Sequence, residues 1–232
     1  MKTNLKKYDV FLFDADNTLF DYDLAEEHAF TVTMENHGLT FTEQIRKKYR
    51  EINDSAWHSY ERGEITKTEF QHSRFRQFFE HMKTGTCEIA FNEGYVNIMG
   101  ECSFLIEGAA EICKAITESG KKLYIVTNGL LSTQNARTKH SAISQYIADS
   151  FVSEVVGFEK PHIKYFEHVL SDIPTVQKDR ILIIGDNLHT DIIGGINAGI
   201  DTCWFNLFAE ENKTGIEPTY EILKLSELNK FI

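Results

Sequence analysis

The sequence predicts an α/β protein with a Rossmann-like parallel β-sheet core and an inserted all-helical cap. Residues 104–232 alternate short apolar segments with amphipathic helices, and a similar apolar segment opens the chain. Residues 21–103 carry helical patterns and no convincing strand. Alternating strands and helices form a mainly parallel sheet covered by helices. We therefore expect a core domain from residues 1–20 and 104–232, and a cap domain from residues 21–103.

The first predicted strand covers residues 8–13 and is followed at once by the sequence D-A-D-N-T. Ligands bind at the carboxyl ends of the strands in open α/β sheets, so Asp14 and Asp16 are expected at one ligand site. Two acids this close raise each other's pKa unless a divalent cation or a shared proton neutralises them. A local alternative is that residues 16–18 form only a turn and a helix cap.

The cap should consist of four helices, because apolar residues recur at helical spacing in four segments. Gly38, Gly63 and Gly85 separate these segments and mark the expected breaks. The predicted helices cover residues 23–37, 42–62, 66–82 and 88–99.

The second part of the core should then add strands and helices in turn. The clearest buried strand is 180–184, in which four apolar residues follow Arg180 and lead into Gly185 and Asp186. Pro161 is compatible with the first turn of the helix that follows Lys160. The predicted strands cover residues 122–126, 150–153, 180–184 and 201–205, and the predicted helices cover 107–119, 162–170 and 190–198.

Polar residues follow four of these strands in the same relative position. They are Asp14 with Asp16, Thr127 with Asn128, Lys160, and Asp186 with Asp191. Each has an ordinary structural explanation, such as a strand-end turn, a surface charge or a helix N-cap. Their convergence at the carboxyl ends of the strands is instead the expected layout of an active site.

The residue types suit phosphoryl transfer to an aspartate and then to water. Asp14 would attack phosphorus, and Asp16 would protonate the leaving oxygen. Asp14, the backbone carbonyl of Asp16 and Asp186 would form an oxygen-rich Mg²⁺ site.

The remaining polar groups have supporting parts in the same chemistry. Thr127 and Asn128 would donate hydrogen bonds to the phosphate, and Lys160 would counter its charge. Asp191 would orient metal-bound waters or hold Lys160. The predicted cofactor is therefore Mg²⁺, and the predicted partner is a small-molecule phosphomonoester.

Composition narrows the class of protein further. The formal net charge of -11 disfavours a nucleic-acid polymer as partner. No stretch has the length and apolarity of a membrane helix, and residues 1–7 lack a signal-peptide apolar run. The four cysteines form no C-x-x-C pair, which is typical of a reducing compartment. We expect a cytoplasmic monomer or homodimer that does not bind membranes.

Together, four segments resemble motifs one to four of the haloacid dehalogenase superfamily: D14-A-D-N-T18, T127-N-G129, the pair Lys160-Pro161, and G185-D-N-L-H-T-D191. The resemblance implies a helical cap of the C1 type. It also implies that Gly129 belongs to the substrate-binding residues and Asn187 to the residues that support the metal site. The superfamily's dehalogenases lack an aspartate at the position of Asp16, so the resemblance is to the phosphatases.

Further segments resemble the YjjG-type pyrimidine 5'-nucleotidases: F13-D-A-D-N-T-L-F20, W57-H-S-Y-E-R-G-E-I65, R74-F75, D191-I-I-G-G-I-N-A-G199 and T202-C-W204. This resemblance implies hydrolysis of UMP, dUMP and dTMP. Trp57 and Arg74, together with Tyr60 and His72, are candidates to contact the base. Aromatic residues at helical spacing in a small cap are also typical of its core.

Three other functions remain open at this point. A sugar-phosphate or phosphoglycolate phosphatase would share the core residues and differ in the cap. A phosphomutase would use the same aspartyl phosphate but transfer the group to a sugar. A non-catalytic phosphate-binding regulatory protein would have the fold without needing both Asp14 and Asp16.

Overall fold

The computed structural model describes residues 6–173 and 176–232. The first five residues of the expected core segment lie outside this part of the chain. The chain divides into two compact units: one runs up to Tyr22 and resumes from Ser103 to Ile232, and the other is Asp23–Cys102. The boundaries expected from the sequence lay at residues 20 and 104. Each unit is described by itself below.

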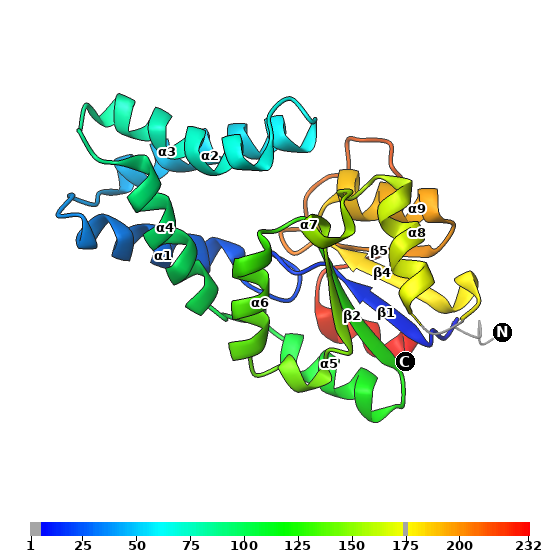
Figure 1. The fold of residues 1–232 in the computed structure, drawn as a ribbon. Coiled ribbons are helices and arrows are strands. Elements are labelled where there is room, and N and C mark those ends of the chain that lie inside the picture. Colours follow the sequence, from blue (N-terminus) through cyan, green and yellow to red (C-terminus); the bar gives the residue numbers. More distant parts are fainter. Residues whose placement is uncertain (1–5, 174–175) are drawn as a thin grey trace. The chain divides into compact units, whose positions relative to one another are not determined.

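The first unit is built on a six-stranded parallel sheet (Figure 1). Its strand order is β3-β2-β1-β4-β5-β6, so the first strand of the chain lies in the middle. Phe13 in β1 is level with Ile125 on one side and Ile184 on the other, which brings the carboxyl ends of three strands together. The predicted α/β class with a parallel sheet is confirmed. The strands are β1 (Val10–Phe13), β2 (Lys122–Thr127), β3 (Asp149–Val152), β4 (Ile181–Gly185), β5 (Asp201–Phe205) and β6 (Tyr220–Ile222).

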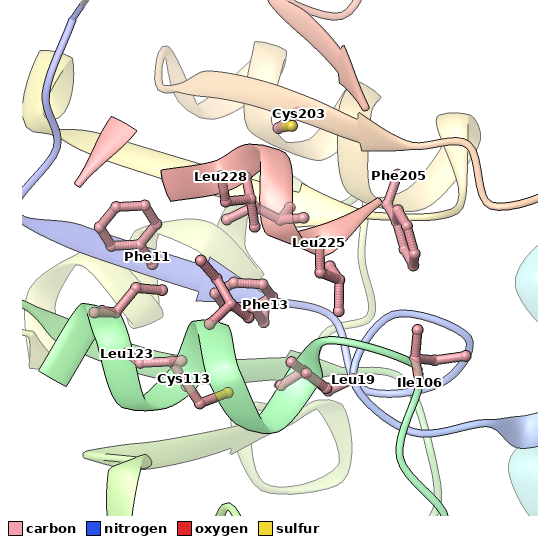
Figure 2. Close-up of a cluster of buried hydrophobic side chains, with 14 of the residues drawn as sticks. Phe11, Phe13, Leu19, Ile106, Cys113, Leu123, Cys203, Phe205, Leu225 and Leu228 are labelled. Atoms are coloured by element: carbon pink, nitrogen blue, oxygen red, sulfur yellow. The ribbon is translucent and has the colours of Figure 1, made fainter. Parts of the chain in front are cut away.

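Both faces of the sheet are buried, as the continuous apolar strands predict. On one face Phe11 and Phe13 pack with α5 (Ala109–Glu118) and the 3₁₀ helix η4 (Leu225–Phe231), as Figure 2 shows. On the other face Val10 and Leu12 pack with α8 (Ile163–Asp172) and the short helix α9 (Ile193–Ala198). Alternate residues of one strand thus serve two separate cores. This double cover holds β1 rigidly in the centre.

The second unit contains the predicted helices, here α1 (Tyr22–Asn36), α2 (Glu43–Glu61), α3 (Lys67–Met82) and α4 (Glu88–Glu101). Thr42 and Thr66 cap α2 and α3, and Thr66 forms a capping box with Glu69. The interior is aromatic: Phe30 stacks on Tyr49 with ring centroids 4.1 Å apart. The unit therefore has a hydrophobic core of its own.

Several elements were not predicted from the sequence. They include α6 (Leu131–His140), α7 (Ser153–Val156), β6 and η4. α6 was missed because its buried residues are Thr133, Gln134 and Arg137, which give no apolar periodicity. The other three are short and depend on contacts with the rest of the sheet. Among the described helices, none combines the length and the apolar composition needed to cross a membrane.

Candidate active site

The turn after β1 places two aspartates at the carboxyl end of the central strand. The Asp14 amide donates to the Ile184 carbonyl at 2.9 Å, which continues the pairing with β4. The amides of Leu19 and Phe20 both donate to the Ala15 carbonyl. Asn17 has a φ of 54°, a left-handed conformation that asparagine tolerates. Asp14 and Asp16 are thus held by a tight turn.

A buried lysine joins Asp14 to the opposite side of the site. Lys160 Nζ donates to Asp14 Oδ1 at 2.5 Å, to Asp191 Oδ1 at 2.6 Å and to the Val126 carbonyl at 2.8 Å. Lys160 is only 4 % exposed. A buried ammonium needs such partners because its desolvation is costly. Residues from three separate parts of the sequence therefore meet at one cation.

The end of β2 fixes the backbone of this lysine. The Asn128 side chain accepts from the Lys160 amide at 2.8 Å and donates to the Lys160 carbonyl at 3.0 Å. The Thr127 hydroxyl accepts from the Gly129 amide at 3.0 Å, so its own proton remains available for another acceptor. In this structure Asn128 therefore positions Lys160. Hydrogen bonds from Thr127, Asn128 or Gly129 to a phosphate remain predictions.

Three carboxylates gather beside Lys160. Asp14, Asp186 and Asp191 each offer an oxygen, and these atoms lie within 4.8 Å of one another. Asp186 follows β4, and Asp191 lies in the π-helical turn η3 (Leu188–Ile192). The second oxygen of Asp191 accepts from the Asn187 amide at 3.2 Å. A Cβ on Gly185 would lie 2.2 Å from that oxygen, so only glycine leaves room for Asp191.

Burial raises the pKa of Asp14 to about 7, and the charges of Asp191 and Asp16 add to the effect although Lys160 opposes it. Burial, followed by the charges of Asp14 and Asp191, also raises the pKa of Asp186 well above its usual range. Burial would lower the pKa of Lys160, but the charges of Asp14 and Asp191 raise it. The lysine therefore stays charged, while the acids remain incompletely neutralised.

This donor set suits a hard divalent cation. Three carboxylates face one ammonium, which leaves an excess of negative charge among oxygen ligands. Mg²⁺ prefers such ligands and usually takes one or two carboxylates. Asp14 and Asp186 are the acids best placed to hold it, because both oxygens of Asp191 already accept hydrogen bonds, from Lys160 and from the Asn187 amide. Coordination by the backbone carbonyl of Asp16 remains a prediction.

The carboxylate of Asp16 lies outside this group of three acids and has partners of its own. Gln134 Nε2 donates to Asp16 Oδ2 at 2.7 Å, and Arg137 forms an ion pair with Asp16 Oδ1. Both partners are on α6, and sequence reasoning assigned neither a role. The available signal was an uncharged amide and a cation spaced i, i+3 in the segment that begins after Thr127-Asn128-Gly129.

The cap candidates lie within the packed interior of the helical unit. Trp57 is partly buried and packs on Phe70 with ring centroids 4.2 Å apart. Arg74 is 2 % exposed and donates to the side-chain oxygens of Asn53 and Asn92. Both residues have structural contacts in this unit, and contacts with a substrate remain predictions. Tyr60 is buried in the same cluster as Phe70, and His72 is partly buried.

The motifs and geometry agree with a comparison against known families. Residues 8–199 match the model of the haloacid dehalogenase-like hydrolases. The chain belongs to this family. The resemblance inferred from the four motifs is thereby confirmed, and the protein is a hydrolase.

Similar proteins span nearly the whole length of this haloacid dehalogenase-like hydrolase. The HAD-hydrolase YfnB of Bacillus subtilis is 37% identical over 97% of this chain and 95% of its own. The pyrimidine 5'-nucleotidase YjjG of Escherichia coli is 34% identical over 97% of this chain and 98% of its own. The pyrimidine 5'-nucleotidase PynA of Streptococcus pneumoniae is 32% identical over 95% and 93%.

Solved structures agree on the fold. A crystal structure of YfnB bound to magnesium superposes with a TM-score of 0.90, covering 96% of this chain and 97% of that one. The L-2-haloacid dehalogenase of Xanthobacter autotrophicus gives a TM-score of 0.75 at 15% identity over 95% of this chain and 96% of that one, which shows a shared fold alone.

Proposed function

We propose that this hydrolase is a magnesium-dependent phosphomonoesterase that cleaves pyrimidine nucleoside 5'-monophosphates through an aspartyl phosphate on Asp14. The observation that carries the proposal is the 2.5 Å contact between Asp14 and the buried Lys160, beside an acidic group with surplus negative charge. That contact fixes one Asp14 oxygen and leaves the other to attack phosphorus.

In the first step an Asp14 oxygen forms a bond to phosphorus, and the bond from phosphorus to the nucleoside oxygen breaks. Asp16 gives a proton to that oxygen, so the nucleoside leaves as a neutral alcohol. Lys160 stays charged throughout and offsets negative charge near the transferring group. The Thr127 hydroxyl would donate a hydrogen bond to a phosphate oxygen, with Gly129 beside it at the end of β2.

In the second step a water molecule attacks the phosphorus of the aspartyl phosphate. Asp16, now ionised, takes a proton from that water, and the bond from phosphorus to Asp14 breaks. Inorganic phosphate leaves, and both aspartates return to their starting states. One phosphomonoester and one water thus become one alcohol and one phosphate.

Asp14 and Asp186 would hold Mg²⁺, with Asp191 and Asn187 supporting them through Lys160 and the loop after β4. The bound ion would neutralise the phosphate and keep it in line with Asp14. The excess of acids over cations at this point supports the assignment.

The substrate proposal rests on similarity along the whole chain. The pyrimidine 5'-nucleotidases YjjG and PynA share about a third of their residues with this protein, cap included. We propose that the helical unit selects the substrate and that Trp57 and Arg74 belong to the selecting region. UMP, dUMP and dTMP are the substrates to test first.

Phosphate release from a panel of substrates tests the proposal. The panel contains UMP, dUMP, dTMP, several sugar phosphates and phosphoglycolate, each with Mg²⁺ and with chelator. Metal-dependent release from the pyrimidine nucleotides, lost in Asp14→Asn, is the expected result. Preference for a sugar phosphate or phosphoglycolate would overturn the substrate while keeping the chemistry. Phosphate binding without turnover would instead indicate a non-catalytic protein.

A further inference from the structure

Helix α6 buries a polar face, unlike α5 and α8, whose buried residues are apolar or aromatic. Its buried residues are Thr133, Gln134 and Arg137, whereas α5 buries Ile112, Cys113 and Ile116 among others. The Arg137 side chain has no exposed surface. Burying a guanidinium is unfavourable unless it is paired and hydrogen-bonded, so a polar inner face calls for a specific reason.

The reason lies in the contacts around Asp16, which Arg137 makes through Nη2, while its Nε and Nη1 have no hydrogen-bond partner among the described residues. Each Asp16 oxygen has its own donor: Gln134 Nε2 reaches Oδ2 at 2.7 Å, and Arg137 Nη2 reaches Oδ1. Arg137 Nη2 also donates to Gln134 Oε1 at 3.0 Å, so the two α6 side chains orient each other. A carboxylate bound through both oxygens cannot rotate without breaking a charged contact.

Two further contacts fix the α6 side chains themselves. The Arg137 guanidinium lies over the Phe20 ring, 4.6 Å from its centroid. A Cβ on Gly129 would lie 2.2 Å from Gln134 Nε2, so glycine at the end of β2 gives Gln134 the room to reach Asp16. The contacts therefore tie together the turn after β1, the end of β2 and the inner face of α6.

We propose that Arg137 and Gln134 are positioning residues that set the direction of the Asp16 carboxylate for proton transfer. Asp14 and Asp16 are only two residues apart, yet each is assigned its own buried cation, Lys160 for the first and Arg137 for the second. Because each has its own cation, the attacking acid Asp14 and the proton-transferring acid Asp16 do not compete for the same hydrogen-bond donors. The inference rests on the proposed function, because it assigns Asp16 the proton transfer.

The test compares Arg137→Met, Arg137→Lys and Gln134→Leu with the wild-type enzyme. For nucleotide substrates, whose leaving group needs a proton, we expect kcat to fall about 10- to 100-fold in Arg137→Met. For p-nitrophenyl phosphate, whose leaving group departs without a proton, the fall in kcat should be about tenfold smaller. KM should change little, Gln134→Leu should show the same leaving-group dependence, and Arg137→Lys should restore part of the rate.

Arg180→Met is the matched control. Arg180 also pairs with an aspartate next to β1, with Nη2 2.8 Å from Asp9 Oδ1, but Asp9 directly precedes the strand, at the end opposite Asp14 and Asp16. It should keep the wild-type rate on both substrates. Equal loss on both substrates in Arg137→Met and Gln134→Leu would overturn the inference, since a merely structural role has no reason to depend on the leaving group.

A double-mutant comparison separates failure of this inference from failure of the proposed function. If Arg137 acts through Asp16, then adding Arg137→Met to Asp16→Asn should lower kcat little further. Independent, multiplicative losses would overturn the positioning role while leaving the phosphatase proposal intact. If the Asp16→Asn variant instead kept the wild-type kcat, Asp16 would have no part in the chemistry, and the inference would fail with it.

Discussion

The two units bury their cations in opposite ways. In the sheet unit, Lys160 bonds to two carboxylates, and a third acid lies beside them. In the helical unit, Arg74 donates to amide oxygens of Asn53 and Asn92, at 2.9 and 3.3 Å. Its guanidinium also lies within 4.6–5.1 Å of the ring centroids of Phe70, Phe75 and Tyr95.

The difference separates a reactive site from a scaffold. The neutral amides and ring faces that contact Arg74 add no charge of opposite sign, and its Nε has no hydrogen-bond partner among the described residues. The acids around Lys160 outnumber it, so the site keeps a negative surplus that a divalent cation can neutralise. The sheet unit thus offers surplus acids to a cation, whereas the contacts of Arg74 described above are all with neutral groups.

The largest expected effect is at the nucleophile. Asp14→Asn should lower phosphate release by roughly four orders of magnitude or more, because an amide cannot form the aspartyl phosphate. Steady-state phosphate release measures this, and circular dichroism checks that the fold is kept. Asp9→Asn, at the other end of β1, is the control and should stay active. Turnover retained in the Asp14 variant would rule out the covalent mechanism.

Removing one of the three carboxylates beside Lys160 should remove most of the protein's response to Mg²⁺. Asp186→Asn should raise the melting temperature of the metal-free protein, because the amide removes the cost of burying a carboxyl group that is ionised in the unfolded chain. The same variant should lose most of the stabilisation that Mg²⁺ gives the wild type. Thermal unfolding with increasing Mg²⁺ measures both effects. An unchanged Mg²⁺ response would place the ion elsewhere.

In the helical unit the corresponding change should affect stability. Arg74→Met should lower the free energy of unfolding by about 3 kcal/mol, because it leaves the amide oxygens of Asn53 and Asn92 without a charged donor. Urea unfolding measures the loss, and Arg76→Met, on the exposed side of the same helix, should be neutral. A higher KM for nucleotides at unchanged stability would favour substrate contact by Arg74.

The smallest expected effect is on the pH dependence of the free energy of unfolding, to which both units contribute. Burial raises the pKa of Glu26, in α1, to about 7, and burial raises that of Asp14 to about 7 as well. Between pH 4 and 7 the unfolded chain then binds fewer protons than the folded one, so the free energy of unfolding should fall as pH rises.

Two changes show which groups cause the fall in the free energy of unfolding with rising pH. Saturating Mg²⁺ should remove the part that comes from Asp14 and from Asp186, whose pKa burial also raises, and Glu26→Gln should remove the part that Glu26 contributes in the helical unit. Glu35→Gln, exposed on the same helix, should leave the slope unchanged. Urea unfolding at several pH values measures the slope. Stability that rises with pH in the metal-free wild type would contradict the raised pKa values.

Much of the sheet unit was predictable from local pattern. Residues 181–184 form a continuous apolar run bounded by Gly185, and β4 lies within one residue of the predicted strand 180–184. The residues at the strand ends were also predictable, because parallel strands bring their carboxyl ends to one edge. The contacts among Asp14, Lys160 and Asp191 follow from that topology.

Helix α6 shows where local pattern was insufficient. Its inner face carries Gln134 and Arg137, which resemble solvent-exposed residues in a one-dimensional pattern. Only the approach of the turn after β1 makes that face an interior one. The edge strand β6 was likewise not predictable from local pattern, because its three residues are held by pairing with β5.

The sequence by itself determined the family, the parallel sheet, the helical insertion and the aspartates that follow β1, because these depend on periodicity and short motifs. Tertiary structure alone decided which cation serves which aspartate. Lys160 and Arg137 lie far from Asp14 and Asp16 in sequence, and their ion pairs form only when the strand order places β1 between β2 and β4. Charge pairing acts through space, and spacing along the chain does not encode it.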